Sequence, residues 1–355
     1  MALIRMLQPL KHPAAKVILV YAGAIAAGYA MSWLRVPLPW MIGPLLLAGV
    51  VSGLGRGVKV PVATRPVGQT VVAAAVGLSF TPAAVLAVAE QIVPMVAVAL
   101  LTIVAGFIVA GVLMRLTRID VVSASLASVP GGPVEMAALA SRYGVAPGPV
   151  AFAQTMRIAL LVLIIPPVLV GIAGGAPDVS EILGGELDLL GAALLLTIAA
   201  AGGFAFRVMR ISSPFFLGPL GLSATAAALS LPVAMPPFVV LASAQVLLGV
   251  WLGCMFDREM LVQSRSFIPA ALVSTLVLMA LCVAMAFGVS ALTGIDWQVM
   301  VLATAPGSVT EMALTAKVLQ QGVAMVTAFH LVRIFIILPA APLIFAITAR
   351  LAGRA

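Results

Sequence analysis

Two short stretches of the chain combine Pro, Gly and Glu at the same spacing. Residues 129–136 read VPGGPVEM, and residues 305–312 read APGSVTEM. Pro and Gly interrupt a helix, and both stretches lie in strongly apolar sequence. A broken backbone in lipid leaves amide and carbonyl groups that protein, water or a ligand must satisfy. The helix that starts after each break directs its N–H groups toward the break, which favours an anionic ligand. We therefore interpret the two breaks as a candidate solute-binding site.

A polar pair follows each break within the next apolar segment. The first pair is Gln154 and Arg157, and the second is His330 and Arg333. A spacing of three residues places both members of a pair on one helix face. Each arginine is expected either to pair with a glutamate of a break or to bind a carboxylate of the solute. His330 is expected to relay protons or to be a satisfied packing residue.

The glutamates of the two breaks are candidate ion carriers. Glu135 and Glu311 would be costly at membrane depth, which favours a role in carrying protons or sodium. The alternative is that each carboxylate only complements the dipole of the helix it begins. Asp120 and Asp296 precede the breaks and are predicted to be helix N-caps. The candidate substrate-binding residues are Pro130, Gly131, Gly132, Glu135, Gln154, Arg157, Pro306, Gly307, Ser308, Thr310, Glu311, His330 and Arg333.

The composition is that of a membrane protein. The 355 residues are 63% hydrophobic and 8% charged, whereas a soluble domain has about 25% charged residues. The formal net charge is +8, but the basic residues lie at the ends of apolar runs, as topology signals do. We therefore expect no nucleic-acid partner. Two Cys and two His cannot form a disulfide framework or a copper site. We expect no catalytic residue, metal or cofactor, and no enzyme activity.

The chain is predicted to be a duplication. Pro130 recurs as Pro306 and Arg157 as Arg333, in both cases 176 positions later. Such repeats are typical of secondary transporters. The predicted parts are a cytoplasmic N-terminus (1–16), a first membrane repeat (17–171), an acidic external linker (172–188) and a second membrane repeat (189–349).

The distribution of Lys and Arg favours an inverted relation between the repeats. If 120–143 and 296–319 crossed the membrane, most basic clusters of the second half would lie outside, against the positive-inside rule. If each is a re-entrant hairpin, these clusters lie inside. Residues 121–130 would make an arm of about 15 Å, half of a ~30 Å hydrocarbon core. The expected fold is all-α and polytopic, with two inverted repeats, about ten transmembrane helices and two re-entrant hairpins. Residues 82–90 are expected to lie at the membrane interface, and Gly43 and Gly218 either to permit close helix packing or to flank the site.

The motifs resemble those of the AbrB-type family of duplicated integral membrane proteins. The resemblance is carried by residues 39–44 (PWMIGP), by both breaks and by the polar pairs that follow them. It covers about 20–350 and implies an integral membrane protein with two similar halves. The family has been labelled both transcriptional regulator and ammonia monooxygenase, so the resemblance implies no substrate.

These patterns favour a secondary transporter that moves a small solute, such as an organic anion, by alternating access coupled to protons or sodium. The alternative is a membrane-embedded regulator that influences gene expression indirectly, because no hydrophilic stretch is long enough for a DNA-binding domain. The expected partners are the solute, the coupling ion and the lipid bilayer, with a homodimer left open. The expected location is a bacterial-type inner membrane, with both termini cytoplasmic.

Overall fold

The chain is helical throughout the part that the structure describes. The computed structural model describes residues 13–56, 58–173, 188–256 and 258–351, and within these ranges it contains helices and no strand. Six helices are long and apolar enough to cross a membrane, or up to seven if one bent pair counts as a span. The protein is thus an all-α polytopic membrane protein, as the composition predicted. Most of the predicted N-terminal segment and of the acidic linker lies outside the described residues.

The sequence predicted about ten transmembrane helices. The described residues contain six long apolar helices, three shorter ones, and one pair, α4 and α5, that is bent by 92°. The interfacial position of α5 and the sidedness of the spans stay predictions. The long helices are α2 (Pro13–Trp33), α6 (Ile92–Thr117), α9 (Pro147–Ala173), α11 (Leu189–Val208), α15 (Ile268–Thr293) and α18 (Val323–Leu351). The shorter ones are α3 (Pro39–Val51), α4 (Thr64–Gly77), α5 (Pro82–Glu90), α12 (Pro214–Ala228) and α13 (Phe238–Cys254).

The bounds of the helices follow the predicted repeat. Helix α6 begins at Ile92 and α15 at Ile268, a separation of 176 residues. The residue after α6, Arg118, has a φ of 56°, and the residue after α15, Gly294, has a φ of 73°. The same separation relates the helices on either side of the two breaks. They are α7 (Val121–Ser128) and α8 (Pro133–Arg142) in the first repeat, and α16 (Trp297–Thr304) and α17 (Val309–Val318) in the second.

The chain divides into two compact units, and each unit contains helices from both repeats. Unit 1 comprises Met1–Ala87, Ile165–Arg258 and Ala313–Ala324. In it α3 packs against α13, and α12 packs against α4, which is the same pairing with the repeats exchanged. A Cβ on Gly43 of α3 would lie 2.5 Å from the carbonyl oxygen of Ala27 in α2, so only Gly permits this approach. The helix-packing interpretation of Gly43 is therefore confirmed.

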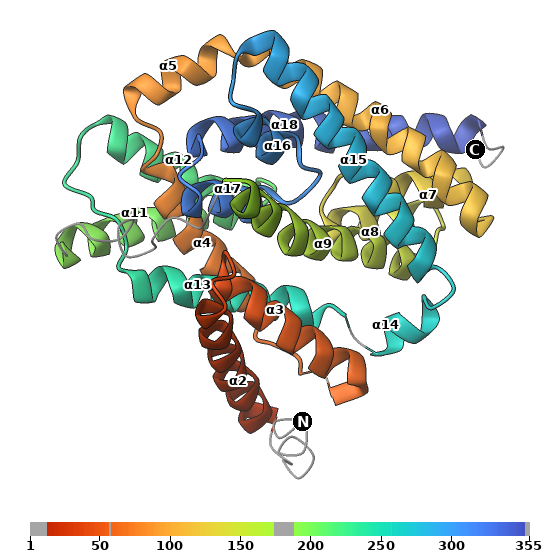
Figure 1. Ribbon diagram of the computed structural model, residues 1–355, viewed down its shortest axis with the longest axis horizontal. Coiled ribbons are helices and arrows are strands. Elements are labelled where there is room, and N and C mark those ends of the chain that lie inside the picture. The colour runs from red at the N-terminus through yellow and green to blue at the C-terminus, as the bar shows by residue number, and fades with distance from the viewer. Residues whose placement is uncertain (1–12, 57, 174–187, 257, 352–355) are drawn as a thin grey trace. The chain divides into compact units, whose positions relative to one another are not determined.

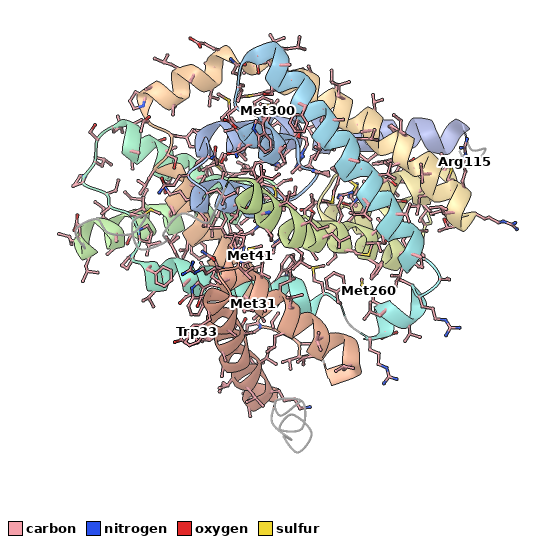
Figure 2. All side chains as sticks on the ribbon, in the orientation of Figure 1. Met31, Trp33, Met41, Arg115, Met260 and Met300 are labelled. Carbon is pink, nitrogen blue, oxygen red and sulfur yellow. The ribbon has the colours of Figure 1, made fainter. Side chains whose placement is uncertain are left out.

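Unit 2 comprises Val88–Ile164, Glu259–Met312 and Met325–Ala355. Its helices α6 and α15, of 26 residues each, pack together and lie beside one another in Figure 1. Leu100, Val104 and Ile108 form one exposed face of α6 at a spacing of four residues. An exposed apolar stripe on a long helix suits contact with lipid chains. Met300 of α16, labelled in Figure 2, is by contrast fully buried.

Candidate functional site

Each break lies between two short helices whose ends are defined by the sequence. Asp120 accepts hydrogen bonds from the amides of Val122 and Ser123, both at 3.0 Å, and so caps the N-terminus of α7. Asp296 caps α16 in the same way through the amide of Gln298, at 2.7 Å. The predicted N-cap roles are confirmed. The chain turns extended at the end of each first arm, with ψ of 127° at Val129 and 130° at Ala305.

Gln154 of α9 ties the first break to the long helix that follows it. Its Nε2 donates to the carbonyl oxygens of Leu126 at 2.8 Å and Val129 at 2.9 Å. Its Oε1 accepts from the guanidinium of Arg157 and, at 3.5 Å, from the amide of Gly131. Arg157 in turn donates from Nη1 to the carbonyl oxygen of Ser128 at 3.0 Å. The pair therefore satisfies backbone groups that the broken helix leaves without helical partners.

His330 of α18 does for the second break what Gln154 does for the first. Its Nε2 lies 2.9 Å from the carbonyl oxygen of Leu302, and its Nδ1 lies 2.7 Å from Nη2 of Arg333. A carbonyl can only accept and a guanidinium can only donate, so the ring is neutral with its proton on Nε2. Leu302 is the repeat counterpart of Leu126. Gln and His are therefore alternative ways to place one donor and one acceptor at the same point, which explains the difference between the repeats.

The side chain of Arg333 holds the second break by hydrogen bonds to the backbone of the break. It donates to the carbonyl oxygens of Ala305 and Gly307, both at 2.6 Å. Among the described contacts, Arg157 uses the carbonyl of Ser128, the last residue of α7, and Arg333 uses that of Ala305, the residue after α16. These carbonyls carry the partial negative charge of a helix end and can stabilise a cation. Arg157 and Arg333 are also close enough for their charges to repel each other. The interior of unit 2 thus has two neighbouring positive charges.

Glu135 lies against the break that precedes it. A Cβ on Gly132 would overlap its carboxylate, so the side chain folds back over the start of α8. Among the described residues, Oε2 of Glu135 is out of reach of solvent and makes no hydrogen bond. Glu311 begins α17 at the equivalent position and is only 4% exposed. The position of both carboxylates in a first helical turn fits complementation of the helix dipole, and an additional ion-carrying role stays a prediction.

The two breaks also contact elements of the opposite repeat. A Cβ on Gly307 would lie 3.2 Å from a methyl group of Leu161 in α9. Ile337 of α18 is the counterpart of Leu161, and it belongs to a buried cluster that includes Val129 and Met136 of the first break. Each break is thus hydrogen-bonded to the long helix of its own repeat and packed against the long helix of the other.

The remaining predicted residues lie in the same unit as these pairs. Pro130, Pro306 and Thr310 are buried. Gly131, Gly132, Gly307 and Ser308 are partly exposed, so these parts of the breaks are the accessible ones. All thirteen candidate substrate-binding residues therefore lie in unit 2, and they come from both repeats.

A pocket beside Arg157 contains residues that the sequence analysis did not identify. It is a small, partly open recess between α6, α7, α9 and α15. Its polar lining consists of Ser128, Arg157, Ser274 and Thr275. A serine and a threonine side by side within the apolar run of α15 were the available signal. Their counterparts in the first repeat, Val98 and Ala99, are apolar, so the repeat does not indicate them.

No metal site is apparent in the described ranges. They contain no group of three or more His, Cys, Asp or Glu side chains able to hold an ion. Cys254 and Cys282 are free thiols. The expectation that neither a metal nor a cofactor takes part stays a prediction.

Comparison with known proteins gives a consistent family. A family described as "Transition state regulatory protein AbrB" matches residues 40–349. The chain is 26% identical over 323 residues to the Escherichia coli (strain K12) protein named "Putative regulator AbrB", covering 87% of this chain and 90% of the relative. It is 24% identical over 353 residues to the Bacillus subtilis (strain 168) protein named "Uncharacterized protein YhjN", covering 93% of this chain and 92% of the relative. No solved structure matches the chain.

Proposed function

The chain belongs to the AbrB family, and we propose that it is a secondary transporter that moves a small organic anion across a membrane by alternating access. The solute passes unchanged, so the proposal includes no catalysis. The membrane is a bacterial inner membrane, and both termini lie in the cytoplasm. The coupling ion is a proton or sodium, carried by the glutamates of the two breaks.

The observation that supports this function is the pair of buried arginines that hold two broken helices. Arg157 is 2% exposed and Arg333 is 5% exposed, and the described hydrogen bonds of both go to backbone carbonyls and to Gln154 or His330. Two such cations in an apolar interior cost free energy that a structural kink alone would not require. An anionic solute would offset their mutual repulsion. The accessible glycines beside them let a ligand approach the backbone closely.

Flux measurements on purified protein in proteoliposomes test the function. Solid-supported-membrane currents are recorded for a panel of small mono-, di- and tricarboxylates, with an inward gradient of protons, of sodium or of neither. At least one carboxylate should give a gradient-dependent current that Arg333→Gln abolishes. Arg115→Gln, at the exposed end of α6, is the matched control and should retain the current. If no solute of a broad panel gives a current in any gradient, the transporter proposal is wrong.

The names of the family and of one relative favour a second candidate, an indirect effect on gene expression. On this view the protein influences transcription through the solute that it moves or through a partner. The Arg333→Gln variant separates the two functions. If transport and regulation are lost together, regulation follows from transport. If a variant without transport keeps full regulatory activity, regulation is the primary function.

A further inference from the structure

The pocket beside Arg157 contains buried polar atoms without partners. Oγ of Ser128, Nε of Arg157 and Oγ of Ser274 make no hydrogen bond to any described residue and are shielded from solvent. All three side chains are at least nine-tenths buried, and all three line the same pocket. A buried polar group without a partner costs about 1–3 kcal/mol, so three of them at one place point to an absent ligand.

The chemistry of these groups selects a small anion. Nε–H of Arg157 can only donate, and the two hydroxyls can donate while rotating freely. The third hydroxyl of the lining, that of Thr275, is buried on the same wall. No carboxylate belongs to the lining, so the positive charge of Arg157 faces the pocket without an acidic neighbour there. Apolar side chains of α6 and α15 complete the wall and limit the space to a compact group.

The second repeat provides an internal comparison. Thr304 is the counterpart of Ser128, and its hydroxyl already donates to the carbonyl oxygen of Cys282 at 3.0 Å. Val98 and Ala99 correspond to Ser274 and Thr275 and offer no polar atom. Ala153 lines the pocket, whereas its counterpart Phe329 is a bulky buried side chain. The polar lining of the pocket is therefore specific to one repeat and does not follow from the architecture that the two repeats share.

We propose that Ser128, Arg157 and Ser274 form a subsite for the carboxylate head group of the solute, which therefore is a carboxylic acid. The carboxylate accepts from Nε–H of Arg157 and from the serine hydroxyls, while Nη1 of Arg157 keeps its bond to the carbonyl oxygen of Ser128 and Nη2 keeps its bond to Gln154. This inference rests on the proposed transport function for its physiological meaning, but the binding itself is independent of transport. Because Arg157 also donates to the backbone of the first break, a ligand bound in the subsite is coupled to that break through Arg157.

The test is direct binding of acetate to the full-length protein in detergent. Sodium acetate replaces sodium chloride at constant ionic strength, and acetamide serves as a neutral molecule of the same shape. Acetate should raise the melting temperature in a saturable way, because a ligand that binds only the folded state stabilises it. Acetamide should have no effect. An equal effect of acetamide, or no effect of acetate, overturns the proposal.

Three variants locate the binding. Ser274→Ala removes one donor to a charged ligand and should weaken acetate binding about tenfold. Ala153→Phe, which introduces the residue of the second repeat, should abolish it. Ser223→Ala removes an equally buried hydroxyl without a described partner in unit 1 and should leave acetate binding unchanged. Equal weakening by the two alanine variants would show that the effect does not come from this pocket.

A third arm uses sodium phosphate, which is an anion with a different shape. Stronger binding of phosphate than of acetate, with the same dependence on Ser274, would overturn the carboxylate assignment. If gradient-driven flux is unaffected by Ser274→Ala and Ala153→Phe, the subsite proposal is wrong and the transport proposal stands. If acetate binding depends on Ser274 but no carboxylate is transported, the transport proposal is wrong and the subsite proposal stands.

Discussion

The equivalence of Gln154 and His330 makes a quantitative prediction. His330→Gln should retain both hydrogen bonds, because an amide also offers one donor and one acceptor, as Gln154 does in the first repeat. His330→Ala should lose both. It would leave the carbonyl of Leu302 and one N–H of Arg333 without their present partners in a fully buried position. At about 1–3 kcal/mol for each orphaned group, the alanine variant should lose about 3–5 kcal/mol of stability, and the glutamine variant under about 1 kcal/mol.

The assay is equilibrium unfolding of the purified protein in mixed detergent micelles, followed by tryptophan fluorescence. The reciprocal variant Gln154→His is the matched control, and its loss of stability should resemble that of His330→Gln. The same variants are then compared in proteoliposomes with a proton gradient. Since the ring of His330 is neutral and both nitrogens are engaged, His330→Gln should keep any proton-driven current. The reasoning would be refuted if His330→Gln were as unstable as His330→Ala, or if it folded normally but lost only the proton dependence.

Three further variants test the local geometry of the breaks and of unit 1. Gly106→Ala in α6 should cost about 1–3 kcal/mol because its Cβ would lie 2.9 Å from the Cα of Val129 in the first break, whereas Gly148→Ala, which meets nothing within 4 Å, should be nearly neutral in the same unfolding assay. Asp120→Ala should lower stability by about 1 kcal/mol through loss of the N-cap of α7, and Asp120→Asn should restore most of it; equal losses would contradict capping. Gly43→Ala should lower the melting temperature of the protein, because the backbone of α2 leaves no room for a Cβ, and an unchanged melting temperature would mean that the two helices separate easily.

The repeat and the two breaks could be predicted from the sequence because their signals are local. Pro, Gly and Glu recur in one register, and a Pro-Gly step interrupts a helix whatever surrounds it. The N-caps at Asp120 and Asp296 were predictable for the same reason, since a cap acts within three residues. The helix bounds in the structure follow these signals closely.

The interactions of the site could not be derived in the same way. The sequence did not indicate that Arg157 and Arg333 donate to backbone carbonyls, because the positions of these carbonyls depend on where each helix ends in space. The common role of Gln154 and His330 is geometric and is hidden by their different chemistry. The repeat does not indicate Ser274, because its counterpart Val98 is apolar. The division into two units that each draw on both repeats is likewise a property of the packing.

The crossed pairing in unit 1 also bears on how such a chain could arise. Because α3 packs on α13 and α4 on α12, each half completes the burial of its short helices with helices of the other. A single-copy precursor would therefore have needed a second polypeptide to complete its fold, and duplication would have joined two subunits that already depended on each other. The present halves, synthesised as separate chains, should each be degraded alone and should assemble when produced together.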